Sequence, residues 1–115
     1  MCSHRSIIVL MNEYKMITLK NGLRVLLVPR ESTGVVTVMI LFKVGSRYES
    51  EDQAGISHVL EHMHYKGTPK RPSGLKIAEF IESIGGEHNA FTGKEYTGYY
   101  TKIAPKHMEK AFDFL

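Results

Sequence analysis

The sequence has only one cysteine, Cys2, among its 115 residues. A disulfide framework is therefore excluded, and so is a cluster of thiolates that could bind a metal ion. Because disulfides belong to oxidising compartments, a chain with so little cysteine favours a reducing one. We therefore expect a cytoplasmic location.

The chain also lacks a long apolar run. The longest, residues 35–44, has about half of the roughly 20 residues that a membrane-spanning helix needs, and its β-branched residues favour a buried strand. The apolar run at residues 7–10 is shorter than the core of a signal peptide. The sequence therefore predicts no membrane anchor.

Charge of one sign is scarce as well, since the formal net charge is only +3. The densest basic stretch, residues 66–76, contains Pro69, Pro72 and two glycines. Such a stretch is more typical of a solvated loop than of a nucleic-acid track, so no nucleic-acid partner is expected. With 43% hydrophobic residues, the chain can bury one small core.

Hydrophobic periodicity predicts five strands and three helices. Asn21 and Gly22 form a strong hairpin-turn signal between two strand-like runs. Gly85 stands where a helix C-cap belongs, and Pro105 fits the first position of a helix that is still running at Leu115. The expected strands are residues 14–19, 23–28, 35–44, 87–92 and 96–103, and the expected helices are residues 54–65, 75–84 and 105–115. This order predicts an α+β fold in which an antiparallel sheet packs against helices.

The helix expected at residues 54–65 carries the array H-x-x-E-H, formed by His58, Glu61 and His62. Residues three and four apart share one face of a helix, so both histidines can reach one ion and Glu61 projects beside them. This is the inverted order of the zinc-peptidase motif H-E-x-x-H. The array predicts zinc bound by two neutral imidazoles, with Glu61 as general base toward a metal-bound water.

The opposite side of this helix is apolar, with Ile56, Val59, Leu60 and Met63. An amphipathic helix with two histidines on its polar face can also arise by chance, because short motifs have false positives. His64 belongs to neither face and is expected at the surface.

The residues around the motif resemble the pitrilysin/insulinase family of zinc metallopeptidases, which includes the mitochondrial processing peptidases. The resemblance covers about residues 15 to 115. It rests on residues 17–25, 55–63, 66–68, 85–86, 89–92 and 95–100. His64 and Tyr65 depart from it, since the family usually has an apolar pair there. Residues 1–13 are expected to be an extension outside the family-like region, with Met11 as a possible natural start.

The resemblance implies that residues 14–115 are a truncated N-terminal part of a processing-peptidase-like domain that ends within a helix. Relatives take a third zinc ligand from a glutamate on a later helix, and no residue here matches it. Five residues can be nominated in its place: Glu87, His88, Glu95, His107 and Glu109. The family also uses a second domain or a partner subunit to close over its substrate, so a homo- or hetero-oligomer or a missing C-terminal domain is expected.

The segment around Asn89 and Ala90 resembles the family's edge strand, to which an extended peptide adds by main-chain hydrogen bonds. The resemblance implies that Asn89 contacts the substrate backbone and that Ala90 permits close approach. Without the resemblance, the pattern of this segment indicates an ordinary strand after a Gly-Gly turn. Tyr96, Tyr99 and Tyr100 are expected to be core and sheet-face residues.

The motif and the resemblance predict two alternative functions. The first is a zinc-dependent metalloendopeptidase domain that acts on peptides or unfolded proteins and needs further chain or a partner for activity. The alternative is a non-catalytic peptide-binding or pairing subunit of a processing-peptidase-like complex. A small domain with no metal role is a third option, and it predicts that His58→Ala leaves zinc uptake unchanged.

Overall fold

A computed structural model describes residues 14–115. Along the sequence these residues divide into two compact units, with the boundary between Thr33 and Gly34. The predicted extension at residues 1–13 and the predicted start at Met11 lie outside the described residues.

The first unit contains the predicted hairpin. Strands β1 (Lys15–Thr18) and β2 (Arg24–Leu27) pair antiparallel. The turn between them is closed by a hydrogen bond of 2.9 Å from the Gly22 N–H to the Leu19 carbonyl. Gly22 has a φ of 85°, a conformation that glycine adopts without steric cost. The Asn-Gly signal therefore predicted the turn correctly.

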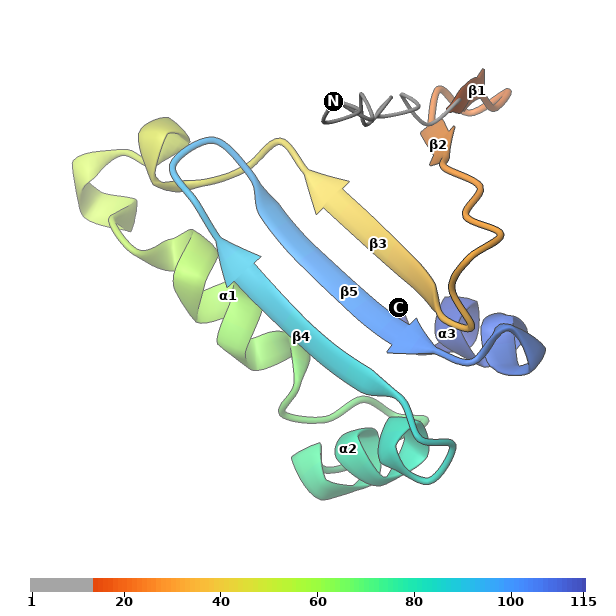
Figure 1. Cartoon of the computed structure of the whole chain (residues 1–115). Coiled ribbons are helices and arrows are strands. Elements are labelled where there is room, and N and C mark those ends of the chain that lie inside the picture. Colours follow the sequence, from red (N-terminus) through yellow and green to blue (C-terminus); the bar gives the residue numbers. More distant parts are fainter. Residues whose placement is uncertain (1–13) are drawn as a thin grey trace, which may run out of the picture. The chain divides into compact units, whose positions relative to one another are not determined.

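The second unit is a three-stranded antiparallel sheet with helices packed against it (Figure 1). The strand order is β3–β5–β4, so β4 is an edge strand of this sheet. The strands are β3 (Val36–Phe42), β4 (Glu87–Thr92) and β5 (Thr97–Ile103). Helices α1 (Ile56–His64) and α2 (Gly74–Glu82) contact β4, whereas α3 (Met108–Phe114) contacts β3 and β5. The predicted α+β class is confirmed.

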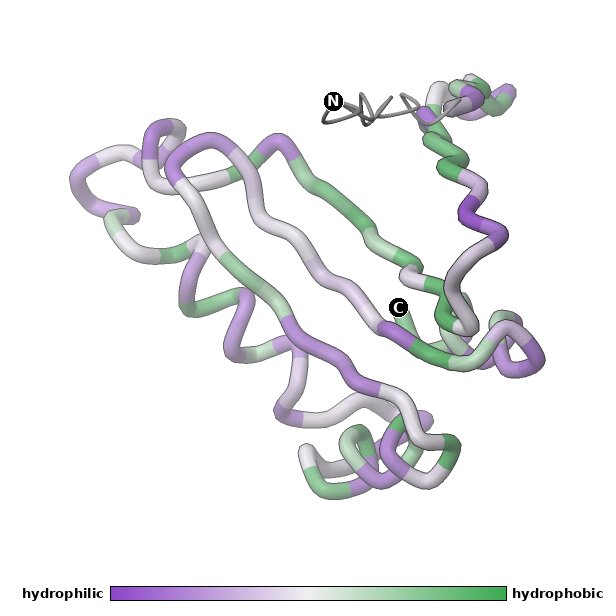
Figure 2. Tube along the Cα trace, viewed as in Figure 1, coloured by the Kyte–Doolittle hydropathy of each residue, from purple (hydrophilic) through white to green (hydrophobic). Residues whose placement is uncertain are grey.

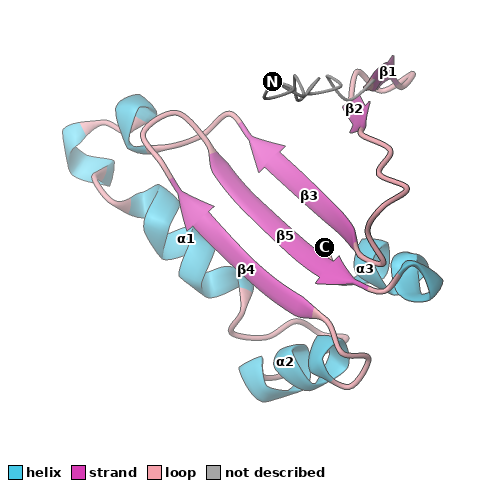
Figure 3. Cartoon of the chain, viewed as in Figure 1, coloured by secondary structure: helices cyan, strands magenta, loops and turns pink. Residues whose placement is uncertain are grey.

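Three short 3-10 turns complete this unit (Figure 3). Two of them, Ser46–Tyr48 and Glu51–Gln53, lie in the segment between β3 and α1. The third, Pro105–His107, begins the last helical segment, so that segment turns α-helical only at Met108. No helix within the described part of the chain is long and apolar enough to cross a membrane.

The hydrophobic core is small and lies mainly under α2. Its central residues are Ile77, Ile81 and Phe114. The Ser73 hydroxyl caps α2 by accepting a hydrogen bond of 3.3 Å from the Lys76 N–H, and the helix is followed by Gly85 with a φ of 69°. The helix expected at residues 75–84 is therefore present as α2, and it contributes Ile77 and Ile81 to the core.

Many apolar side chains remain at the surface. Strand β3 is mostly hydrophobic (Figure 2), yet Met39 and Leu41 on one of its faces are exposed. On α1 the apolar side is exposed too, and Ser57 is the buried residue of the helix. Helix α1 therefore meets the sheet mainly through Ser57 and the half-buried Glu61 and His64.

Candidate metal centre and strand edge

Helix α1 brings together the two histidines of the H-x-x-E-H array. The Nε2 atoms of His58 and His62 lie 2.9 Å apart, and the ring centroids are separated by 4.6 Å. Both side chains are exposed, whereas Glu61 on the neighbouring face is half-buried. The one-turn spacing of the histidines therefore produces the convergence that the sequence predicts.

This pair fits half of a zinc site. A histidine nitrogen binds zinc at about 2.0–2.1 Å, so one ion can contact two nitrogens only if they are less than about 4.2 Å apart. The 2.9 Å separation of the two Nε2 atoms meets that condition. Without an ion, one of these Nε2 atoms must carry a proton and the other must accept it. The donor set is therefore suited to a shared metal ion.

The described residues do not bring a third metal ligand to His58 and His62. No group of three or more His, Cys, Asp or Glu side chains in residues 14–115 is arranged to hold a metal ion. Glu95 instead pairs with Arg47, and the Glu87 carboxylate lies 3.3 Å from the Lys102 ammonium. None of the five nominated residues therefore completes the pair.

The carboxylate of Glu61 has a partner that the sequence analysis did not anticipate. The Thr92 hydroxyl, at the end of β4, donates a hydrogen bond to Glu61 Oε2. These residues are 31 positions apart, and no local pattern links them. The bond connects the motif helix to the edge strand.

The N-terminus of α1 is held by an acidic side chain from the preceding segment. Gly55 occupies the N-cap position and offers no capping side chain. The Glu49 carboxylate accepts hydrogen bonds from the N–H groups of Gly55 at 2.6 Å and Ser57 at 2.9 Å. The neighbouring Ser57 hydroxyl, followed by these two N–H groups, lowers the pKa of Glu49 below its ordinary value. Glu49 thus satisfies helix-terminal donors that would otherwise lack a partner.

We expect Glu49→Gln to make stability less sensitive to acid. Because the pKa of Glu49 is lower in the folded than in the unfolded state, its contribution is fully present above the ordinary value of 4.5. The contribution is lost as the pH falls through the lower folded pKa. Urea unfolding midpoints measured at several pH values below about 6 should fall less steeply in Glu49→Gln than in the unmodified chain. Glu82→Gln, at an exposed position on α2, is the control. An equal change of the urea midpoint with pH in all three proteins would contradict the prediction.

The segment before α1 is hydrogen-bonded to the turn between β4 and β5. The Arg47 N–H donates to the Lys94 carbonyl at 2.8 Å, and the Ser46 N–H donates to the Gly93 carbonyl at 3.3 Å. A Cβ at Gly45 would lie 2.4 Å from the Gly93 carbonyl oxygen, so only glycine permits this approach. An open cleft of about 560 Å³ results. Its lining includes His58, Glu61 and Thr92.

Among residues 14–115 no strand pairs with the outer edge of β4, and the register of this edge is defined. The Gly93 N–H bonds to the Tyr96 carbonyl, so these residues form a hydrogen-bonded pair. Hydrogen-bonded and non-bonded pairs alternate along an antiparallel ladder. Ala90, paired with Tyr99, and Thr92 therefore direct their N–H and C=O groups away from β5. These groups are available to an added strand.

Asn89 and Ala90 have different positions on this strand. Successive side chains point to opposite faces, so Ala90 lies on the face that α1 covers and Asn89 lies on the other. The Asn89 side-chain oxygen accepts a hydrogen bond of 2.8 Å from the Ala90 N–H, one of the outward-facing donors. The Asn89 carboxamide is therefore in contact with the edge, where the predicted substrate backbone would lie.

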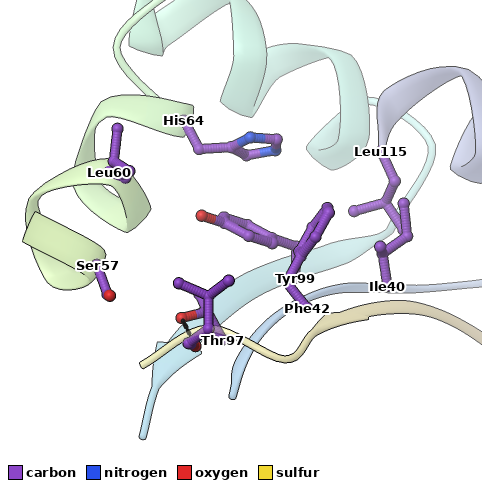
Figure 4. A pocket seen from close by; sticks show the side chains of 9 residues that line it. Ile40, Phe42, Ser57, Leu60, His64, Thr97, Tyr99 and Leu115 are labelled. Carbon is purple, nitrogen blue, oxygen red and sulfur yellow. Dashed lines mark hydrogen bonds between the residues drawn. The ribbon is translucent and has the colours of Figure 1, made fainter. Parts of the chain in front are cut away.

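The prediction that His64 is a surface residue is wrong. Its ring is half-buried and lies 4.3 Å from the Tyr99 ring, centroid to centroid. Both rings line a mainly apolar cavity of about 310 Å³, with Leu60 and Phe42 on either side (Figure 4). Burial, with a smaller contribution from His88, lowers the pKa of His64. The angular position of His64 around the helix does not predict this contact, because the contact depends on how α1 crosses the sheet.

Tyr65, Tyr99 and Tyr100 are partly buried, as expected for sheet-face and packing residues, whereas Tyr96 is exposed and is not a core residue. Burial is the main cause that raises the pKa of Tyr65 to about 12. Its ring lies against His88 at a centroid distance of 5.1 Å, while Tyr96 is exposed and meets Phe91 edge-on. Tyr65 thus stays neutral throughout the physiological pH range.

Comparison with known proteins identifies the family. The model of the insulinase family, peptidase family M16, matches residues 24–115. The chain belongs to this family. The resemblance that the motif and its surroundings predict is therefore confirmed, and the candidate site lies within the matched part of this M16 chain.

Relatives of this M16 chain include both bacterial and eukaryotic proteins. Zinc protease YmxG of Bacillus subtilis is 44% identical over 101 residues, which are 88% of this chain and 24% of that protein. The mitochondrial-processing peptidase subunit beta of Dictyostelium discoideum is 41% identical over 104 residues, covering 90% of this chain and 22% of that subunit.

The fold is similar to a solved structure of the same kind. A protease from Helicobacter pylori superposes with a TM-score of 0.83 and 38% sequence identity, over 90% of this chain and 25% of that one. The M16 chain thus spans about a quarter of the length of the relatives it matches.

Proposed function

We propose that this chain carries part of the active site of a zinc-dependent metalloendopeptidase. The observation that carries the proposal is the 2.9 Å separation of His58 Nε2 and His62 Nε2, with Glu61 on the adjacent face of the same helix. Membership of a family whose relatives are named zinc proteases supports the choice of metal.

In this proposal His58 and His62 hold the ion through neutral imidazole nitrogens. Zinc, when bound, supplies Lewis acidity that acidifies a water molecule and polarises a peptide carbonyl. Glu61 accepts the proton of the attacking water at a carboxylate oxygen and returns it to the nitrogen of the leaving amine. His58 and Glu61 line an open cleft of about 560 Å³, in which a peptide is proposed to bind.

The peptide is proposed to bind along the free edge of β4. The outward N–H and C=O groups of Ala90 would pair with its backbone, and the Asn89 carboxamide would exchange its contact with the Ala90 N–H for one with the peptide. Main-chain pairing of this kind is independent of side chains, so peptides and unfolded proteins are the expected substrate class.

Activity in this proposal requires donors from outside the described residues. A catalytic zinc site normally has three protein ligands, and the described part of the chain brings two together. Further polypeptide or a partner would supply the third, in line with relatives about four times as long. The missing donor also favours the second candidate, a non-catalytic pairing subunit. The Dictyostelium discoideum relative is itself named as a subunit.

Zinc titration of the metal-stripped 115-residue chain tests the metal site. We expect zinc uptake at one site that the double variant His58→Ala, His62→Ala abolishes, because both nitrogens contact the same ion. Competition with a chromophoric chelator measures the affinity. His107→Ala, which removes a histidine from the turn before α3, is the matched control. Equal uptake by the unmodified chain and the double variant would leave the metal proposal without support.

A further inference from the structure

The Thr92 side chain forms a hydrogen bond that links β4 to α1, and its acceptor is the carboxylate of the proposed base. A hydroxyl has a single proton to donate, and an ionised carboxylate can only accept. Thr92 therefore directs that proton at Glu61 Oε2. The paired residue on β5, Thr97, uses its hydroxyl differently, donating to the Val44 carbonyl at 2.9 Å.

The two oxygens of Glu61 are thereby made unequal. Oε2 accepts the Thr92 hydroxyl, whereas Oε1 accepts no hydrogen bond from residues 14–115. A glutamate side chain otherwise samples several rotamers, and ordering it costs conformational entropy. A contact that removes this freedom before the reaction places the proton acceptor in advance.

We infer that Thr92 is a positioning residue, which holds Glu61 by Oε2 and leaves Oε1 as the oxygen that receives the proton. The inference rests on the proposed function, in which Glu61 is the general base. The hydrogen bond between Thr92 and Glu61 does not depend on that role. The hydrogen bond of the Thr92 hydroxyl goes to Glu61 and not to a histidine, so in this inference Thr92 acts through Glu61.

The position of Thr92 on the strand gives this contact a second consequence. Its backbone N–H and C=O face the free edge of β4, like those of Ala90 two residues earlier. A peptide paired along this edge would contact the main chain of the residue whose side chain holds the carboxylate. One residue therefore sets the distance between the peptide backbone and Glu61.

A purely structural role for the same bond makes a different prediction. If the bond only fastened β4 to α1, its loss would lower the melting temperature and leave Glu61 ordered. If it positions the carboxylate, Thr92→Val would release the Glu61 side chain. Valine keeps the β-branched shape and the strand preference of threonine but has no hydroxyl.

The test uses the whole 115-residue chain, isotopically labelled for NMR. Three-bond couplings about the side-chain torsions of Glu61 report whether it occupies one rotamer. We expect a single rotamer in the unmodified chain, averaged couplings in Thr92→Val, and recovery of the single rotamer in Thr92→Ser, which restores the hydroxyl. Unchanged couplings in Thr92→Val would overturn the inference.

A second measurement requires no variant to fold. A hydroxyl proton bound to a carboxylate exchanges slowly with water, whereas that of the exposed Thr37 on β3 should exchange fast. Slow exchange at Thr92 supports the inference, and exchange as fast as at Thr37 overturns it.

Kinetics of a form of the protein that hydrolyses peptides separate this inference from the proposed function. Thr92→Val should lower kcat about tenfold or more with little change in KM, since a hydrogen bond to a charged group is lost, and Thr92→Ser should recover most of the rate. Thr92→Val should cause no further loss of kcat when Glu61 is already glutamine.

Full activity of Glu61→Gln would refute the role of Glu61, while the rotamer and exchange measurements would still decide whether Thr92 holds the Glu61 side chain. A normal kcat in Thr92→Val, with Glu61→Gln inactive, would refute the inference alone.

Discussion

Replacing Glu61 by glutamine is expected to lower kcat for peptide hydrolysis by about 10²- to 10⁴-fold, the usual contribution of a general base. The amide has nearly the same shape, and its oxygen can still accept the Thr92 hydroxyl. It cannot accept a proton from water, however, so the loss falls on the chemical step. Steady-state kinetics of a peptide-hydrolysing form of the protein, with zinc content measured in parallel, would test this.

The zinc content of Glu61→Gln should match that of the unmodified protein, because Glu61 is proposed as a base and not as a ligand. Glu82→Gln, which removes an exposed carboxylate from α2, should retain full activity. Two results would contradict the assignment of Glu61. One is hydrolysis at the normal rate, and the other is zinc loss large enough to account for the inactivity.

The second large effect concerns the core. Ile81→Ala is expected to lower the free energy of unfolding by about 2–5 kcal/mol, as for other large-to-small changes at buried positions. Ile81 is fully buried in the cluster with Ile77 and Phe114. Only five hydrophobic residues in the described part of the chain are buried, so this loss is a large share of the total stability. Urea unfolding followed by circular dichroism measures it.

Leu75→Ala is the matched control for this variant. Leu75 is on the same helix, and 68% of its surface is exposed, so its truncation removes little buried surface. We expect a change within about 0.5 kcal/mol, as for surface substitutions generally. If the two variants lost equal stability, Ile81 would not be a core residue and the packing of α2 would be wrong.

Elements with strong local signals were predicted well from the sequence. The Asn-Gly turn and the Gly85 that follows α2 each rest on chemistry within a few residues. The helical segments near 54–65 and 75–84 were found as α1 and α2, with ends shifted by one or two residues. The last helix differs more, since it opens with a 3-10 turn at Pro105.

The candidate site was predicted only in its local part. The convergence of His58 and His62 follows from helical spacing and needs no tertiary information. The roles of Glu49 and Thr92 do not follow from spacing, because each depends on how separate segments meet. His64 illustrates the same limit, since its burial depends on the angle at which α1 crosses Tyr99.

If peptides bind as proposed, the edge of β4 would also determine which conformations of a polypeptide the chain can bind. Its outward groups at Ala90 and Thr92 can pair only with a backbone that is extended and has unpaired groups of its own. Helices and the inner strands of folded domains have already used those groups. The Asn89 oxygen on the Ala90 N–H adds a small barrier that a partner must displace. Such an edge would discriminate unfolded from folded polypeptide by backbone availability alone, before any side chain is read.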